Sequence, residues 1–121
     1  MGQVVQSYRD LVVWQKGILL TKEVYLLTAN FPDAEKYGLT NQMRRAAVSI
    51  PSNIAEGQGR RSMPDFRRFL HIALGSTAEL DTQLIIAVEL GYLTHESTIK
   101  ANGLIVEIKK MLYTLIDKLT N

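Results

Sequence analysis

The chain has 121 residues, a length that suits one domain with a hydrophobic core of its own. It contains no cysteine, which excludes disulfides and thiolate metal sites, and its longest apolar run is far too short to span a bilayer. The formal net charge is only +2, and the opening residues Met1–Gln6 carry neither a secretion signal nor a myristoylation pattern. We therefore expect a soluble, cytoplasmic protein with no membrane association.

Apolar residues recur at helical spacing through nearly the whole chain, and no segment alternates as a strand does. The first predicted helix spans about residues 10–28 and ends before Pro32, which cannot continue a helix. The second spans about residues 39–56 and is ended by Gly57 and Gly59.

Pro51 lies inside the second predicted helix, where a proline removes one backbone hydrogen bond and clashes with the preceding turn. We expect a kink near residues 49–53. The alternative is a break in the helix with a restart at Ser52.

The third predicted helix spans about residues 63–90 and closes at Gly91. Its start has Ser62 as the N-cap, Pro64 in the first turn and Asp65 at the third helical position.

The fourth predicted helix spans about residues 95–119, and Thr94 can cap it. Short connections between long helices favour antiparallel neighbours. The sequence therefore predicts an all-α fold, an antiparallel up-down-up-down four-helix bundle that forms a single domain over residues 1–121.

The second, third and fourth helices each carry one apolar stripe, as expected for helices that dock on a core through one face. The predicted core residues are Leu39, Met43, Ala46, Ala47, Ile50, Ile54, Phe66, Phe69, Leu70, Ala73, Leu74, Leu80, Leu84, Leu104, Ile105, Ile108, Met111, Leu112, Leu115, Ile116 and Leu119.

The first helix differs because apolar residues cover almost its whole circumference. Its three stripes are Leu11, Trp14, Ile18 and Tyr25; Val12, Leu19 and Leu26; and Val13, Leu20, Val24 and Leu27. One stripe is enough to dock a helix in a small bundle, so the surplus predicts contact with another subunit. The alternative is a central helix in a monomer. The predicted oligomer interface is Val12, Leu19, Leu26, Val13, Leu20 and Leu27, with Gly75 and Ser76 as a second close contact.

Residues with catalytic or metal-binding chemistry are sparse. His71 and His95 have no partner at metal-ligand spacing, and no segment resembles the elbow of a serine nucleophile. The segment 57–61 lacks the strand and the Gly-Lys-Ser/Thr ending of a phosphate-binding loop. We expect no catalytic residue, metal, cofactor or small-molecule substrate, and hence no enzyme.

Charge is sorted along the chain. Residues 44–68 hold six of the seven arginines against two acids, whereas residues 69–99 hold four acids and no Lys or Arg. Guanidinium groups bind planar anions in a bidentate manner, so the cluster indicates phosphate or carboxylate partners. Salt bridges between subunits, with Glu56, Glu79 or Asp81, are the open alternative.

Helix geometry divides the arginines into two groups. Arg44 and Arg45 lie roughly 17 Å before the end of the second helix. The other four surround the turn into the third helix, where free backbone N–H groups favour anions. The predicted nucleic-acid-binding residues are Arg60, Arg61, Arg67, Arg68, Arg44 and Arg45, of which Arg60, Arg61 and Arg67 form the best anion site.

One long segment carries a family resemblance. Residues 35–57 read EKYGLTNQMRRAAVSIPSNIAEG and are followed by Gly59 and Arg60. Shorter matching segments are Asp10-Leu11, Val13-Trp14-Gln15, Phe31-Pro32, Ala73-Leu74-Gly75-Ser76 and Glu79-Leu80. The chain resembles the bacterial four-helix bundle family of 23S rRNA intervening-sequence proteins, over nearly its whole length.

The resemblance implies four antiparallel helices and, as in relatives, a homopentameric ring. Genes of this family are found inside intervening sequences of ribosomal RNA genes, which is a location rather than an activity. A related branch, the accessory variability protein of diversity-generating retroelements, binds a reverse transcriptase and nucleic acid through a basic pentameric surface.

These observations lead to one functional hypothesis and one alternative. The hypothesis is a non-enzymatic homo-oligomer that binds structured RNA or a nucleoprotein partner through its arginines, with multivalency strengthening each contact. The alternative is a protein–protein interaction scaffold whose arginines form structural salt bridges within the oligomer.

Overall fold

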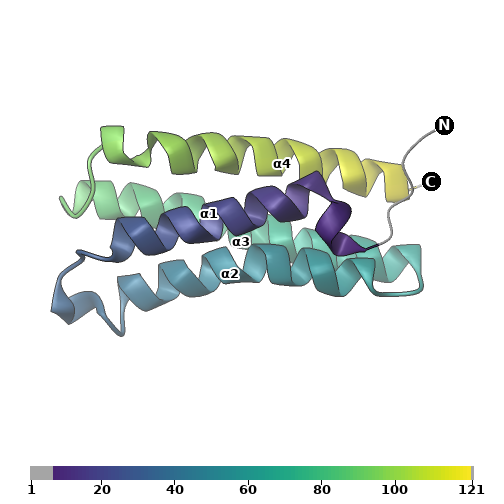
Figure 1. Cartoon of the computed structure of the whole chain (residues 1–121), viewed down its shortest axis with the longest axis horizontal. Coiled ribbons are helices and arrows are strands. Elements are labelled where there is room, and N and C mark those ends of the chain that lie inside the picture. The colour runs from purple at the N-terminus through teal and green to yellow at the C-terminus, as the bar shows by residue number, and fades with distance from the viewer. Residues whose placement is uncertain (1–6, 121) are drawn as a thin grey trace.

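A computed structural model describes residues 7–120, so the expectation about Met1–Gln6 falls outside the described residues. Four helices lie side by side as a bundle: α1 (Val12–Thr28), α2 (Leu39–Gln58), α3 (Met63–Glu89) and α4 (Ile99–Leu119) (Figure 1). No strand occurs among the described residues. Each helix packs on its neighbours in sequence, and α1 packs on α4. The predicted all-α bundle is therefore confirmed.

The start of α3 forms as its sequence predicts. The Ser62 hydroxyl accepts a hydrogen bond from the Asp65 amide at 3.2 Å, and Pro64 lies in the first turn, where it interrupts no hydrogen bond. The helix ends at Glu89, and the chain then turns at Gly91, whose φ of +79° is readily reached only by glycine.

The starts of α1 and α4 differ from expectation because short 3-10 turns precede both helices. Thr94 and Ser97 exchange hydrogen bonds, each hydroxyl accepting the other's amide at 3.0 Å, and they close the turn Glu96–Thr98. Thr94 therefore bonds to Ser97 ahead of α4 and does not cap that helix, whose N-cap is Thr98. In the same way the turn Tyr8–Asp10 precedes α1.

Helix α2 continues through Pro51, so the alternative of a break at Ser52 is wrong. Proline leaves the carbonyl of Ala47, four residues earlier, without its helical amide partner. The Thr21 hydroxyl of α1 lies 3.1 Å from that carbonyl oxygen and 2.8 Å from the Gly17 carbonyl. Buried Gly17 faces the Pro51 ring, where an added Cβ would lie 3.2 Å from the proline Cβ. Helix α1 thus supports α2 at its proline.

The core consists mainly of the predicted stripes of α2, α3 and α4, joined by one stripe of α1. Fully buried members include Met43, Ile50, Leu70, Leu84 and Leu112, whereas Leu39, Phe66, Leu74, Met111, Leu115 and Leu119 are partly buried against them.

The core also takes residues that the sequence assigned to another subunit. Val13 and Leu20 are only 4% and 0% exposed, and half-buried Leu27 packs against the same cluster. Val13 and Leu20 are therefore core residues of their own subunit and are not available to an oligomer interface, whereas the interface role of half-buried Leu27 stays a prediction. They follow the helical spacing of Gly17 and Val24, and this stripe is the one that α1 turns toward its own bundle.

The two loops at the end of the bundle away from the α2–α3 turn are linked through Glu35. Its carboxylate accepts the Leu39 amide at the start of α2 at 3.0 Å and the Tyr92 hydroxyl at 2.9 Å. The Tyr92 ring also lies against Phe31, with ring centres 5.3 Å apart. This end of the bundle is therefore held by one carboxylate and one aromatic pair. None of the described helices is both long and apolar enough to cross a membrane.

Candidate interaction surfaces

Two arginines at the α2–α3 turn lie against one aromatic ring. The guanidinium carbons of Arg60 and Arg68 are 4.8 Å and 4.4 Å from the centre of the Phe69 ring. Each also has an exposed ion pair, Arg60 with Glu56 at 3.5 Å and Arg68 with Asp65 at 3.6 Å. Exposed pairs contribute little energy, so these contacts orient the two guanidinium groups without removing them from solvent.

The other two arginines of this turn have different surroundings. Arg67 is half-buried and its Nη1 donates to the Leu119 carbonyl, one of the acceptors that the end of α4 leaves free. It serves the fold, by joining α3 to the last turn of α4. Arg61 is exposed and has no hydrogen bond, ion pair or ring contact with the described residues.

Arg44 and Arg45 lie far along α2 from the turn, as helix geometry predicts. The Arg44 Nε donates to the buried Thr28 hydroxyl at 2.9 Å, and the guanidinium carbon lies 4.5 Å from the centre of the Tyr25 ring. Arg45 is exposed and has no such partner within residues 7–120. The structure thus keeps the six arginines in two separate groups.

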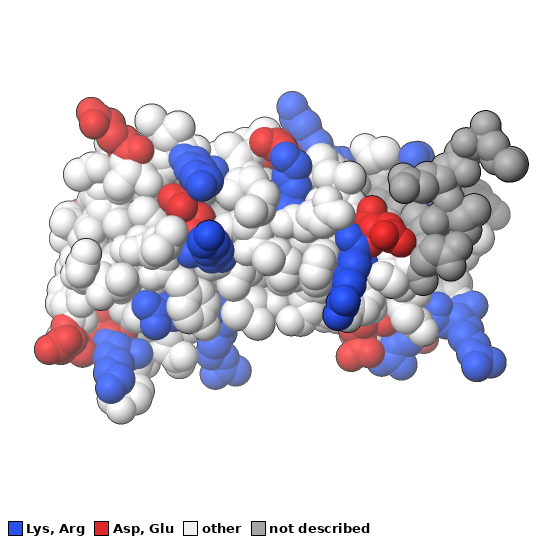
Figure 2. All heavy atoms as spheres, in the orientation of Figure 1, with Lys and Arg blue, Asp and Glu red and all other residues white. Residues whose placement is uncertain are grey.

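Charge is dispersed on the face shown in Figure 2. Basic and acidic side chains lie interspersed, several of them side by side, with broad uncharged areas between them. Lys16 of α1 pairs with Glu107 of α4 at 2.5 Å, and Lys109 of α4 lies 3.7 Å from Asp81 of α3. This face is therefore not a continuous basic surface.

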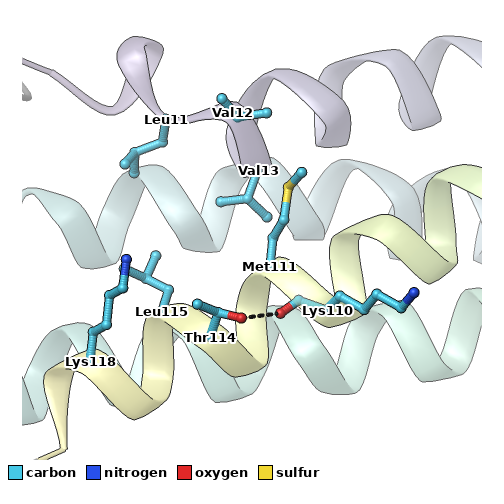
Figure 3. Close-up of a pocket in the computed structure, with 8 residues that line it drawn as sticks. All are labelled: Leu11, Val12, Val13, Lys110, Met111, Thr114, Leu115 and Lys118. Carbon is cyan, nitrogen blue, oxygen red and sulfur yellow. Dashed lines mark hydrogen bonds between the residues drawn. The ribbon is translucent and has the colours of Figure 1, made fainter. Parts of the chain in front are cut away.

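The second predicted stripe of α1 is solvent-exposed in the subunit. Val12, Leu19 and Leu26 are 53%, 50% and 61% exposed. Near the start of α1 the surface is hollowed by an apolar groove of about 370 Å³ against α4, in which Val13 points toward Met111 and Val12 lies farther from α4 (Figure 3). Large exposed apolar surface of this kind is characteristic of interaction sites.

Gly75 and Ser76 of α3 differ in their surroundings. An added Cβ at Gly75 would meet nothing within 4 Å, so this position is open for close approach of another chain. The half-buried Ser76 hydroxyl instead pairs with the Ser49 hydroxyl of α2 at 2.8 Å. Ser76 therefore contacts α2 of its own subunit.

Two adjoining hollows lie between α1 and α2 and share Val48; together they are called the groove between α1 and α2. One part, about 370 Å³, is lined mainly by Trp14, Ile18, Val48 and Ala55, and Tyr8 closes its end against Trp14 with ring centres 5.3 Å apart. The other part, about 510 Å³, shares Val48 and is lined by Tyr25, Asn41, Arg44, Arg45 and Ser49. The periodicity of the sequence could not reveal this groove, because its floor combines residues of two helices.

Two hydrogen-bonding residues were also missed, Thr21 and Glu35. Their partners lie 26 and 57 residues away in the chain, Ala47 and Tyr92 respectively. A sequence signal existed only for Thr21, because Pro51 requires some donor for the Ala47 carbonyl. Among residues 7–120, no cluster of three or more His, Asp or Glu side chains could hold a metal ion.

A family model described as 23S rRNA-intervening sequence protein matches residues 9–114, nearly the entire bundle. The chain belongs to this family. Its fold is similar to that of a protein with unknown function from the S23 ribosomal protein family of Bacteroides thetaiotaomicron VPI-5482, solved at 1.70 Å. The two share 28% sequence identity with a TM-score of 0.79, over 88% of this chain and 96% of that chain. No curated protein matches the chain. Membership thus establishes the family and the fold, and neither comparison assigns an activity.

Proposed function

We propose that this member of the 23S rRNA-intervening sequence proteins is a non-enzymatic homo-oligomer that binds structured RNA, or RNA within a nucleoprotein, in the cytoplasm. The observation that carries the proposal is the placement of Arg60 and Arg68 on the Phe69 ring, with exposed Arg61 next to Arg60 in the same turn. Two guanidinium groups are oriented by one ring and the third has no partner within the described residues. Such groups are available to phosphate oxygens.

The neighbouring backbone supports the same interpretation. These arginines flank the start of α3, where amide groups and the helix dipole favour negative charge. Arg67, which the sequence included in this site, is bonded to α4, so we assign phosphate contact to Arg60, Arg61 and Arg68. Arg44 and Arg45 lie too far along α2 to bind the same phosphate.

Self-association would multiply this weak site. The exposed stripe Val12, Leu19 and Leu26 and the open position Gly75 support contact between copies of the chain. The pentamer implied by the family resemblance would repeat the arginine group once per subunit, and linked weak sites bind far more tightly than one.

The test is binding of an RNA hairpin to the full chain across a salt series. Phosphate contacts give a linear fall of log affinity with log salt concentration, and removal of two contacts in Arg60→Ala/Arg61→Ala reduces the slope by about 1 to 2. The matched control is Lys100→Ala/Lys110→Ala, which removes two charges from exposed positions of α4 and should leave the slope unchanged. Failure of the wild-type chain to bind at low salt would refute the proposal.

A protein–protein interaction scaffold is the second candidate. It is favoured by the structural contacts of Arg44 and Arg67 and by the amount of exposed apolar surface. Because Arg67 joins α3 to α4 within the subunit, Arg67→Ala would in this case destabilise the subunit and through it the oligomer, measured by sedimentation, while RNA affinity would stay unmeasurable or unchanged. RNA binding by the arginines predicts that Arg60→Ala/Arg61→Ala changes the salt dependence of RNA affinity, whereas the scaffold predicts that Arg67→Ala changes the sedimentation of the oligomer.

A further inference from the structure

The groove between α1 and α2 has the shape and chemistry of a helix-binding site. Its lining extends from Trp14 to Tyr25 on α1 and from Ala55 back to Asn41 on α2. These spans correspond to roughly 16 Å and roughly 21 Å, or three to four helical turns. Ile18, Tyr25 and Val48 are each more than 40% exposed along this length, and Ile18 and Val48 present apolar surface to solvent beside the Tyr25 ring, one face of which Arg44 covers.

The walls of the groove restrict the kind of occupant. All described elements beside it are helices, and the one helical carbonyl that Pro51 leaves open is bonded to Thr21, so the groove offers no strand edge to an extended peptide. A helix satisfies its own backbone and can bury an apolar face with anchors three, four and seven residues apart. The floor is also poor for a nucleobase, because Trp14 packs on Tyr8 and Arg44 covers the Tyr25 ring.

The two ends of the groove differ in charge. Its only charged lining residues are Arg44 and Arg45, and both lie at one end. Arg44 is fixed in place, because its Nε is bonded to Thr28 and its guanidinium lies on Tyr25, and its two Nη atoms have no partner among the described residues. A fixed guanidinium loses little freedom when it binds a carboxylate.

We propose that this groove binds an amphipathic helix of a partner protein, about three turns long, which places carboxylates at one end over Arg44 and Arg45. The exposed α1 stripe of a second copy carries Lys22 on one flank and Glu23 on the other between Leu19 and Leu26, so it does not offer the concentrated negative charge that the two arginines favour. The proposal is independent of RNA binding at the α2–α3 turn.

Trp14 is the only tryptophan in the chain and lines the groove, so its fluorescence reports occupancy. The probe is a synthetic amphipathic helix with leucines three and four residues apart and two glutamates at one end, titrated into the full chain. We expect a change in Trp14 emission on binding. A peptide with lysines in place of the glutamates should bind at least about tenfold more weakly.

Two charge-reversal variants distinguish a direct contact between the peptide and Arg45 from a general effect of the protein's net charge. Arg45→Glu should weaken binding of the acidic peptide at least about tenfold, whereas Arg61→Glu, with the same charge change at the α2–α3 turn, should alter it less than about twofold. Val48→Asp, at an exposed position on the groove floor, should abolish binding while helicity by circular dichroism is retained.

The proposal would be overturned if the acidic peptide did not bind, if both peptides bound with equal affinity, or if Arg61→Glu weakened binding as much as Arg45→Glu. It would also be overturned if the groove had another occupant. If Trp14 emission changes on dilution and Val48→Asp reduces the oligomer, a second copy fills the groove. If an RNA hairpin displaces the peptide, the groove binds nucleic acid.

Discussion

Single side chains complete the backbone hydrogen bonding of this bundle at two places where helix geometry leaves a group without a partner. Thr21 serves the carbonyl that Pro51 leaves open in the middle of α2, and Glu35 serves the Leu39 amide at the start of the same helix. Thr21 thereby joins α1 to α2, and Glu35 joins the start of α2 to Tyr92, 57 residues away, through its second hydrogen bond. Their loss should therefore affect the packing of elements as well as the local turn.

We expect Thr21→Val to lower the free energy of unfolding by about 1–3 kcal/mol, because the Ala47 carbonyl would lose a half-buried donor with little change in side-chain volume. Urea denaturation measures the difference. The control is Thr114→Val, whose exposed hydroxyl donates to Lys110 in its own helix and whose loss should cost less than about 0.5 kcal/mol. Equal effects in the two variants would contradict a special role for Thr21.

The carboxyl of Glu35 gives a pH-dependent contribution. The Leu39 amide and then the Tyr92 hydroxyl, which donate to its charged form, hold the pKa of Glu35 below its ordinary value. The resulting stabilisation is present above the pKa of the unfolded chain and is lost as pH falls through the folded-state pKa. Glu35→Gln should thus lower the melting temperature at neutral pH, and the gap from wild type should narrow in acid.

Circular dichroism melts over a pH series measure this effect, and Glu23→Gln in the middle of α1 is the control. A gap for Glu35→Gln that stays constant with pH would show that the carboxylate charge is not what holds the two loops together.

At the scale of elements, glycine sets how closely helices approach at the α2–α3 turn. An added Cβ at Gly57 would lie 2.7 Å from the Phe69 Cβ and 3.0 Å from the Phe66 ring, so no side chain fits without displacement of α3. Gly103, inside α4, has nothing within 4 Å of the same position.

Alanine substitution at these two glycines should therefore change the free energy of unfolding in opposite directions. Gly57→Ala should destabilise the bundle by about 1–3 kcal/mol through overpacking. Gly103→Ala should stabilise it by about 0.4–1 kcal/mol, because alanine favours the helix and restricts the unfolded chain. Chemical denaturation gives both values, and destabilisation by Gly103→Ala would mean that its surface is covered by another chain.

The elements themselves could be predicted from the sequence because their signals are local. Apolar spacing and the Ser62–Asp65 cap depend on neighbours in the chain, and α2 and α3 begin at the predicted residues. The start of α4 was missed because the exchange of hydrogen bonds between Thr94 and Ser97 closes a 3-10 turn first. Spacing alone does not distinguish a 3-10 turn from the first turn of an α-helix.

The candidate site was less predictable because its determinants are not local. Nothing near Arg67 in the sequence indicates that it binds the Leu119 carbonyl, and nothing near Arg44 indicates Thr28. The three apolar stripes of α1 were visible, but the direction of the helix decides which one is core. That direction depends on Gly17 meeting Pro51, which is a contact between helices.

At the scale of the whole molecule, the exposed stripe of α1 should decide the assembly state. We expect Leu19→Glu/Leu26→Glu to shift the oligomer toward monomer, because two charges cannot be buried in an apolar interface. Sedimentation velocity measures the shift, and circular dichroism should show unchanged helicity. Tyr37→Lys, at an exposed loop position, is the control, and an unaltered oligomer in the α1 variant would exclude this stripe from the interface.

The short turn between α2 and α3 has a consequence for the order of folding. Only residues 59–62 separate these two helices, so Gly57 can meet Phe66 and Phe69 at a small cost in loop-closure entropy. The α1–α4 contact joins opposite ends of the described chain and must form later. In stopped-flow experiments we expect Gly57→Ala mainly to slow refolding and Thr21→Val mainly to accelerate unfolding. The hairpin of α2 and α3 would then be the template on which the outer two helices assemble.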